Sequence, residues 1–345
     1  MNIKRVGWLL VGVIMAAGIF LYALFNKEIK TLSTLSRVEN TTLFSMEYRD
    51  DYGLDEFLEK GARTDAEVVE FVSKKLLKGL PLEFELPDFG CSTFAAQTPD
   101  GDYIFGRNFD FKPTPILVLK TYPESGYASV STVDLDFLGY GNHNLPTDAG
   151  FLDKAVILAS AYAPMDGINE KGLSIAVLQI FDEPTRQSTG KLGLTTSTAI
   201  RMVLDKAATV DEAINLLKQY DMNASAGSNY HFQLADASGN TAIVEYINNE
   251  MKILEQAQCA TNFLLTPGQW NDKGEGYDRY DTLKATLGRT KNTLTEQEGM
   301  MLLKSVVLND EGWPTQWSAV FNNTRKTINY CIHRDYKKTY SFSVR

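Results

Sequence analysis

The chain has 345 residues, of which 44% are hydrophobic, and its formal net charge is -9. This length allows one large hydrophobic core or two smaller ones. The acidic balance, with no block rich in lysine and arginine, argues against a nucleic-acid partner, because phosphate binding needs concentrated positive charge. We therefore expect a small molecule or a peptide as the substrate.

The first segment, residues 1–25, has the pattern of a membrane anchor. Residues 6–25 carry no charged side chain and follow Lys4 and Arg5. At about 1.5 Å per residue, a helix of this length crosses ~30 Å of hydrocarbon. The stretch exceeds the apolar core of a signal peptide, and no clear small-x-small cleavage site precedes Asn26. We expect an uncleaved anchor rather than a cleaved signal, with a catalytic domain outside the cytoplasm that is either membrane-anchored or secreted after processing.

The next segment, residues 26–90, is rich in charge and predicts one helix. Thr64 is the expected N-cap, apolar residues follow at roughly helical spacing, and Leu80-Pro81 ends the helix. We interpret the remainder of this segment as a tether or pro-segment. It precedes the expected catalytic domain, residues 91–345.

Beyond residue 90, short strands predominate, separated by turns rich in glycine and asparagine. We predict strands at 91–98, 102–109, 116–121, 156–162, 173–180, 231–236, 241–246, 251–256, 258–264, 317–322, 328–334 and 339–344. We predict helices at 196–207, 211–219, 277–288 and 295–308. Strict alternation of strand and helix is absent, so the order favours an α+β fold of antiparallel sheets covered by helices.

Cys91 lies at the start of a predicted β-hairpin. Asp100-Gly101 is a favoured two-residue loop, and counting back from it along both strands places Cys91 opposite Asp110. Opposed Cβ atoms lie roughly 4.5–5.5 Å apart, so Asp110 would reach the backbone nitrogen or the side chain of Cys91. In this register Arg107 falls on the other face. A bulge or a different loop length would be needed to bring it inward.

A cysteine nucleophile needs a base, or cationic surroundings, to form its thiolate. Nothing in the sequence places any of the three histidines, His143, His231 and His333, beside Cys91. The α-amino group of the nucleophile itself can serve as the base, because its pKa is about 8. This mechanism requires cleavage of the Gly90–Cys91 bond. Glycine has no Cβ, so it leaves its carbonyl open to attack by the neighbouring thiol.

Other chemistries have weaker signals. Cys259 and Cys331 sit in strand-like runs, where an inert buried thiol is the ordinary interpretation, although an exported protein could pair them. No cluster of histidine, cysteine and aspartate has metal-ligand spacing, and no phosphate-binding loop or serine-nucleophile elbow occurs. We expect neither a metal nor a cofactor.

Several motifs follow one another along residues 91–345. They are Cys91, Gly106-Arg107-Asn108-x-Asp110, Asp166–Leu173, Asp236–Glu245, Thr261-Asn262 and Tyr277-Asp278-Arg279-Tyr280. In this order they resemble the choloylglycine hydrolase family of N-terminal-nucleophile amidases, which includes bile salt hydrolases and penicillin V acylases. Acid ceramidase and N-acylethanolamine acid amidase are relatives of that family. The resemblance covers nearly all of residues 91–345.

The resemblance implies a four-layer αββα fold and hydrolysis of a linear amide. Cys91 would be the nucleophile and its freed amine the base. Arg107 would support the thiolate and Asp110 would hold the amine. Asn262 matches the family's oxyanion-hole asparagine, and Arg279 matches a late arginine of the active site. Each donor aimed at a developing oxyanion is typically worth ~3 kcal/mol.

The chain departs from bile salt hydrolases at two places. Gln179 stands where they carry asparagine, so it is either a second oxyanion donor or only a polar residue at a strand edge. Bile salt hydrolases begin almost directly with their cysteine, whereas Cys91 follows 90 residues. This favours the extracytoplasmic or lysosomal amidases that have a pro-segment.

We therefore expect a self-maturing cysteine amidase that acts on a small N-acyl compound. Two alternatives stay open: a membrane-tethered binding protein of the same fold without turnover, and an acyltransferase that passes the acyl group to an amine. The substrate depends on pocket loops, for which residues 122–150 and 181–194 are the candidates. The oligomeric state cannot be predicted.

Overall fold

The computed structural model describes Met15, Gly18 and residues 25–84, 87–141, 143–269, 274–309 and 312–344. The membrane anchor predicted at residues 6–25 falls almost wholly outside these residues. Within them, no helix combines the length and the apolar character needed to cross a membrane.

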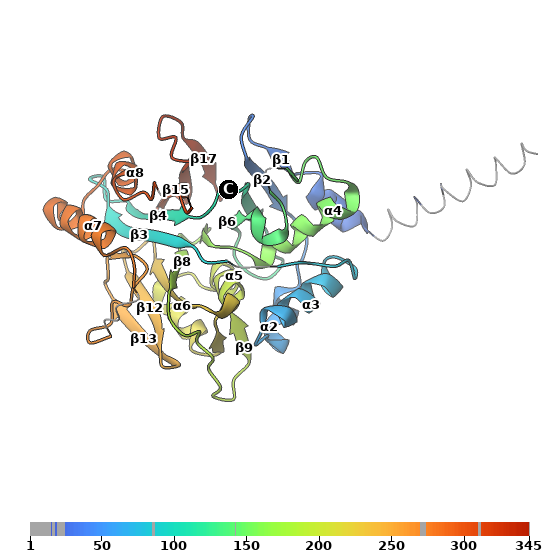
Figure 1. Ribbon diagram of the computed structural model, residues 1–345, viewed down its shortest axis with the longest axis horizontal. Coiled ribbons are helices and arrows are strands. Elements are labelled where there is room, and N and C mark those ends of the chain that lie inside the picture. The colour runs from blue at the N-terminus through green and yellow to red at the C-terminus, as the bar shows by residue number, and fades with distance from the viewer. Residues whose placement is uncertain are drawn as a thin grey trace, which may run out of the picture.

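Two large β-sheets form the centre of the molecule (Figure 1). The first has nine strands, in the order β1 (Ser36–Arg37), β2 (Leu43–Tyr48), β5 (Ile116–Thr121), β6 (Ser129–Asp134), β7 (Asp166–Asn169), β8 (Ser174–Ile180), β11 (Asn229–Ala235), β12 (Thr241–Ile247) and β13 (Glu250–Glu255). The second has six strands, in the order β14 (Cys259–Ala260), β3 (Gly90–Gln97), β4 (Tyr103–Asp110), β15 (Thr315–Asn322), β16 (Thr327–Ile332) and β17 (Tyr340–Ser343). A separate parallel pair joins β9 (Gly193–Thr195) and β10 (Asp221–Asn223).

Helices cover the sheets from outside. Helices α7 (Tyr277–Thr290) and α8 (Glu296–Ser305) pack on β3, β4 and β15 of the six-stranded sheet. Helices α5 (Thr196–Lys206) and α6 (Val210–Leu217) pack on β7, β8 and β12 of the nine-stranded sheet. The two sheets meet each other through β3 and β8. The prediction of antiparallel sheets covered by helices is confirmed except at one pair, β2 and β5, which is parallel.

The alternation of side chains along β3 explains this layering. Phe94 and Ala96 point to the helix side, where they join Leu283 of α7 and Leu303 of α8 in one apolar cluster. Cys91 lies in the other cluster, between the two sheets. Successive side chains of a strand point to opposite faces, so a single strand contributes to both layers of the core.

The N-terminal segment contributes far more structure than the one predicted helix. That helix is α3 (Asp65–Lys75), and its N-cap Thr64 accepts a hydrogen bond from the Glu67 amide, as predicted. The same segment also forms β1, β2 and α2 (Leu54–Lys60). Strand β2 pairs in parallel with the whole of β5, so part of the predicted tether belongs to the nine-stranded sheet.

Two predicted strands are wrong in type or extent. Residues 156–162, predicted as a strand, form the 3-10 helix η2 (Val156–Tyr162), which is buried from Ile157 to Tyr162. A fully buried apolar run has no periodicity that distinguishes helix from strand. The strand predicted at 258–264 is only the two-residue β14.

The candidate pocket loop 122–150 contains β6 and the 3-10 helix η1 (Leu135–Leu138). The remaining short helices are α4 (Phe151–Ala155) and η3 (Ser225–Gly227).

Candidate active site

The β3–β4 hairpin sets the position of Cys91, and its register differs from the prediction by one residue. Gln97 pairs with Tyr103, and the Thr98 amide donates to the Asp102 carbonyl, so three residues form the loop. Its last residue, Gly101, has φ of 91°, which suits the left-handed position of a three-residue loop. The extra loop residue shifts every pair, so Cys91 lies opposite Phe109 and not opposite Asp110.

This shift brings Arg107 to the Cys91 side of the sheet. Arg107 pairs with Thr93, two residues from Cys91, and residues two apart share a face. Asp110 pairs with Gly90. The different loop length is therefore the feature that resolves the predicted conflict between Arg107 and Asp110.

Cys91 is completely buried and has polar contacts on each side. Its amide donates to Asn262 Oδ1 at 2.8 Å. Arg107 Nη2 donates to Sγ at 3.2 Å, and Sγ lies 3.5 Å from the Val177 carbonyl. The Cys91 carbonyl accepts from Arg279 Nη1 at 2.9 Å. Three predicted site residues thus touch Cys91 directly.

Arg107 is itself held rigidly. Its Nη1 donates to the Met165 carbonyl at 2.7 Å, and its Nε lies 3.2 Å from Asp166 Oδ2. The guanidinium carbon lies 5.0 Å from the centre of the Phe109 ring and 5.6 Å from that of Trp317. A buried guanidinium with one carboxylate partner and two aromatic neighbours keeps its charge directed at Sγ.

Asp166 is a site residue that sequence reasoning did not single out. Besides Arg107, it accepts a hydrogen bond from Trp317 Nε1 at 3.0 Å. Its signal in the sequence is its place at the head of the Asp166–Leu173 motif. Nothing in that motif alone indicates that its carboxylate reaches Arg107 from a different sheet.

Arg279 connects the other predicted residues. It lies in the first turn of α7, after the N-cap Gly276. Its Nη1 donates to Asp110 Oδ2 at 2.9 Å, and its Nη2 donates to Asn262 Oδ1 at 3.0 Å. Asp110 also accepts from the Thr315 hydroxyl. Arg279 therefore holds the carboxylate and the amide that flank the backbone of Cys91.

Gln179 has a different position from the other predicted residues. Its Oε1 accepts from the Phe89 amide at 2.6 Å, and its Nε2 donates to Ser228 Oγ at 2.7 Å and to the Asp88 carboxylate. Only its backbone carbonyl meets the site, where it accepts from Asn262 Nδ2 at 2.9 Å. In the intact chain the side chain of Gln179 thus binds the residues that precede Cys91.

Burial determines the protonation of the site. It raises the pKa of the Cys91 thiol to about 12, an effect that outweighs the lowering by Arg107 and Arg279. Burial also raises the pKa of Asp110 against the opposing effect of Arg279, and that of Asp166 against Arg107. In the intact chain the thiol is therefore protonated at neutral pH and is a poor nucleophile.

The histidines have partners elsewhere. His231 Nε2 lies 2.8 Å from the Thr261 carbonyl and its Nδ1 lies 3.3 Å from Glu245. His333 contacts Thr42 and Gln316, and His143 is exposed. All three cysteines are free and buried. The part of the chain that the structure describes contains no group of histidine, cysteine and acidic side chains that could hold a metal ion.

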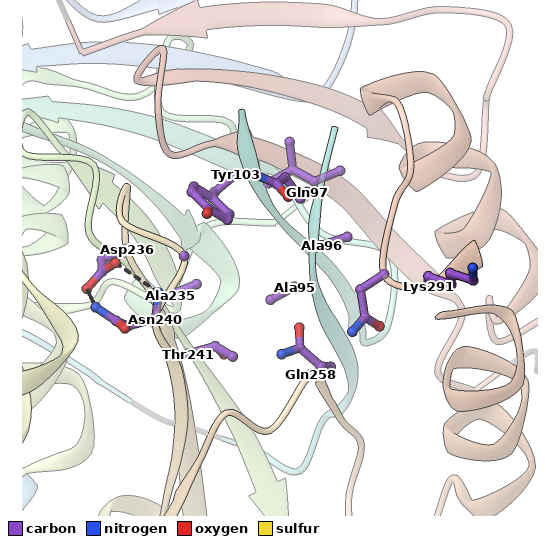
Figure 2. Close-up of a pocket in the computed structure, with 13 residues that line it drawn as sticks. Ala95, Ala96, Gln97, Tyr103, Ala235, Asp236, Asn240, Thr241, Gln258 and Lys291 are labelled. Atoms are coloured by element: carbon purple, nitrogen blue, oxygen red, sulfur yellow. Dashed lines mark hydrogen bonds between the residues drawn. The ribbon is translucent and has the colours of Figure 1, made fainter. Parts of the chain in front are cut away.

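A separate hollow lies at the far end of the same hairpin (Figure 2). It is lined by Gln97 and Tyr103, six or more residues along the strands from Cys91 and Phe109, a distance of roughly 20 Å at 3.3 Å per residue. The Asp236 carboxylate at its wall is bound to Asn240 and to the amides of Ser238 and Val210. Asp236 thus stabilises a turn and the start of α6, and this hollow is distinct from the Cys91 site.

Comparisons of the sequence with protein families and with individual proteins agree with each other. Residues 91–298 match the family described as linear amide C-N hydrolases, choloylglycine hydrolase family. The penicillin V acylase of Pectobacterium atrosepticum is 33% identical over an alignment of 115 residues, and this alignment covers 28% of this chain and 31% of the acylase. The chain thus matches about a third of the length of that curated relative.

The solved structures of one hydrolase show the same fold. Two variants of the conjugated bile acid hydrolase from Clostridium perfringens superpose with TM-scores of 0.50 and 0.51, at 16% sequence identity. Both comparisons cover 73% of this chain and 92% of the hydrolase. The penicillin V acylase from Agrobacterium tumefaciens has a TM-score of 0.45 at 18% identity, over 73% of this chain and 86% of that acylase.

Proposed function

Because the chain belongs to the choloylglycine hydrolase family of linear amide C-N hydrolases, we propose that it is a self-maturing cysteine amidase that acts on a small N-acyl compound. The observation that carries the proposal is the environment of Cys91. Its sulfur accepts a hydrogen bond from Arg107 at 3.2 Å, while its backbone nitrogen is bound to Asn262 at 2.8 Å. Few structural roles of a buried cysteine require a cation on the sulfur and a fixed acceptor on the nitrogen.

Maturation is proposed as an attack on the preceding peptide bond. The Cys91 sulfur adds to the Gly90 carbonyl carbon, the Gly90–Cys91 C–N bond breaks, and the nitrogen takes up the proton of the thiol. The resulting thioester is hydrolysed by water, which releases the carboxylate of Gly90 and restores the thiol. The new N-terminus is then the α-amine of Cys91, next to Asn262 Oδ1 and near Asp110, which pairs with Gly90.

Turnover is proposed to use the same groups. The free amine, with an ordinary pKa of about 8, accepts the proton of the thiol, and Arg107 stabilises the thiolate. The thiolate adds to the carbonyl carbon of the substrate amide, the amine returns the proton to the leaving nitrogen, and water hydrolyses the thioester. We assign the oxyanion role to the Asn262 amide and the holding of the amine to Asp110, with Arg279 orienting both.

The packing of helices, sheet, sheet and helices supports the finer assignment to the four-layer αββα architecture of N-terminal-nucleophile hydrolases. On this assignment the nucleophile stands at the end of a strand, between the two sheets, as Cys91 does on β3.

Mass spectrometry of the purified protein tests the proposal. We expect a fragment that begins at Cys91, and we expect the Cys91→Ala chain to remain whole. Cys259→Ala is the matched control, because it removes another buried thiol outside the site and should leave processing normal. A wild-type enzyme that is active with an intact Gly90–Cys91 bond would refute the mechanism.

A substrate panel identifies the reaction. Conjugated bile salts, penicillin V and fatty acyl amides cover the acyl groups to be compared, and product analysis with added amines separates hydrolysis from acyl transfer. Cleavage of none of them, together with an unprocessed chain, would favour a binding protein of the same fold.

A further inference from the structure

We propose that residues 26–84 remain bound after the Gly90–Cys91 bond is cut, as a second chain of the mature enzyme, and that only the residues next to the cut leave their positions. This inference rests on the proposed maturation. Figure 1 shows the N-terminal strands and helices packed against the rest of the molecule and not extended away from it.

The first argument is the continuity of the nine-stranded sheet. Strand β2 pairs with β5 from Leu43 opposite Ile116 to Tyr48 opposite Thr121. Strand β5 therefore lies between β2 and β6, and its apolar residues are completely buried. Loss of β2 would expose that strand as a long apolar edge with unpaired backbone groups, a form that folded proteins avoid.

The second argument is the aromatic packing across the cut. Phe57 of α2, which is 1% exposed, meets Phe71 of α3 at 5.2 Å and Tyr162 of η2 at 5.4 Å between ring centres. The Tyr52 ring meets that of Tyr162 at 6.4 Å. Residues on both sides of the cut belong to one apolar cluster, so dissociation would divide the main core of the protein.

The third argument is a set of buried polar contacts across the cut. The Tyr52 hydroxyl donates to the Asp205 carboxylate, and Asp205 is paired with Arg201 at 3.0 Å inside the protein. Tyr162 donates its hydroxyl hydrogen bond back to the Tyr52 carbonyl at 2.9 Å. Removing Tyr52 would leave a buried carboxylate with one partner fewer, which is unfavourable.

Hydrogen bonds around α3 complete the attachment. The Ala62 amide donates to the Gly193 carbonyl at 2.9 Å, and Arg63 Nη2 donates to the Lys191 carbonyl at 2.7 Å. Asp65 accepts from Ser225 Oγ at 2.7 Å and from the Ala226 amide at 3.0 Å. The attachment therefore reaches from the sheet to the β9–β10 region and is not confined to one surface.

The residues next to the cut differ from the rest of the N-terminal segment, because they have to leave their positions. Phe89 is 1% exposed, and its ring lies 5.2 Å from that of Phe109 and 5.8 Å from that of Tyr230. Cys91, two residues further along the chain, has no exposed surface. A substrate carbonyl reaches Sγ only if Phe89 and its neighbours move, whereas nothing in the chemistry requires β2, α2 or α3 to move.

Size-exclusion chromatography of the processed full-length protein tests this inference. We expect both fragments to elute together in a one-to-one ratio, and to stay together at about 1 M NaCl, where exposed ion pairs are screened but apolar packing is not. A folded fragment that begins at Cys91 and elutes alone would overturn the inference.

A second arm does not depend on self-cleavage. A site for a sequence-specific protease is inserted after the exposed Glu83 in the Cys91→Ala chain, and the cut protein is analysed in the same way. Co-elution supports retention, and separation of the fragments refutes it. A wild-type chain that never cleaves itself would refute the proposed maturation, while this arm still decides whether the N-terminal segment stays bound.

A matched pair of substitutions on α2 tests which contacts hold the two fragments together. In the protease-cut protein, Phe57→Ala should raise the fraction of the catalytic fragment that elutes alone, because it removes the ring packed on Tyr162. Glu59→Ala, on the exposed side of the same helix, should not change that fraction. Equal release by both variants would contradict the assigned interface.

Discussion

At the scale of single residues, the site depends on a cation placed against a sulfur. Arg107 meets Sγ at 3.2 Å and Asp166 at 3.2 Å, both fully buried. The guanidinium therefore has two effects that can be separated: it compensates a buried carboxylate, and it lowers the pKa of the thiol. One effect concerns stability and the other concerns chemistry.

Arg107→Met should impair both effects. We expect a loss of about 3–5 kcal/mol in the free energy of unfolding, because Asp166 is left unpaired in the core. We also expect self-cleavage to slow by ~10-fold or more, because each unit of rise in the thiol pKa removes about nine-tenths of the thiolate. Urea unfolding and time-resolved mass spectrometry measure the two quantities.

The double variant Arg107→Met, Asp166→Asn separates them. With both charges removed, most of the stability should return while cleavage stays slow. Recovery of the cleavage rate together with stability would mean that Arg107 has only a structural role.

Gln179 offers a second test at this scale. Its side chain binds the Phe89 amide at 2.6 Å, before the cut, and not the Cys91 backbone. Gln179→Ala should therefore slow self-cleavage and leave the kcat of protein that has already been cleaved unchanged. Ser228→Ala removes only a neighbouring contact of Gln179 and should have a smaller effect. A fall in kcat of the cleaved Gln179→Ala enzyme would instead support the role of oxyanion donor.

At the scale of elements, the hairpin that carries Cys91 tolerates little change at its first residue. A Cβ on Gly90 would lie 3.1 Å from both Cβ and Oδ2 of Asp110, and 3.4 Å from Leu308 Cδ1. Gly90→Ala should displace Asp110 from Arg279 and slow cleavage by ~10-fold or more, the scale expected for sub-ångström misplacement of reacting groups.

A glycine in a helix provides the control for that substitution. A Cβ on Gly288 of α7 would extend into open space, so Gly288→Ala should leave cleavage normal and add about 0.5–1 kcal/mol of stability through helix propensity. Mass spectrometry and urea unfolding of both variants check the contrast. Normal cleavage in Gly90→Ala would show that the contact with Asp110 is unimportant.

The same hairpin shows how far sequence reasoning reaches. Its two strands and the pairing partner of Cys91 within one residue could be predicted from β-forming residues and a turn signal. The three-residue loop could not, because Asp100-Gly101 is equally compatible with the shorter turn. A shift of one residue reverses the face of the sheet to which each side chain points. The observed register therefore places Arg107 on the same face as Cys91, where it contacts the sulfur, and not on the opposite face as predicted.

Contacts between residues far apart in the sequence were the second feature that the sequence alone could not predict. Asn262 and Arg279 were found only through their order in family motifs, since no local rule brings a strand end and a helix N-terminus to Cys91. Strand β2 was missed because a short segment with alternating buried and half-buried residues resembles a charged linker until its partner β5 is known.

At the scale of the whole molecule, the N-terminal segment and the residues after Gly90 share one β-sheet and one apolar cluster, and they are joined by a covalent bond that the enzyme is proposed to cut. Strand β2 lies within the sheet, and Phe57 and Tyr52 share a core with Tyr162. If the segment stays bound, unfolding of the cleaved enzyme must also separate its two chains. Dilution then favours the unfolded state by mass action.

This coupling predicts a concentration dependence that only the cleaved enzyme has. For a complex of two chains that dissociates on unfolding, each tenfold dilution lowers the free energy of unfolding by about 1.4 kcal/mol. The urea midpoint of the processed wild-type protein should therefore fall steadily over a hundredfold range of protein concentration. The intact Cys91→Ala chain has the same packing without the cut, so its midpoint should not move. A concentration-independent midpoint in the cleaved enzyme, with the N-terminal fragment absent from the folded state, would mean that the catalytic domain is stable without β2.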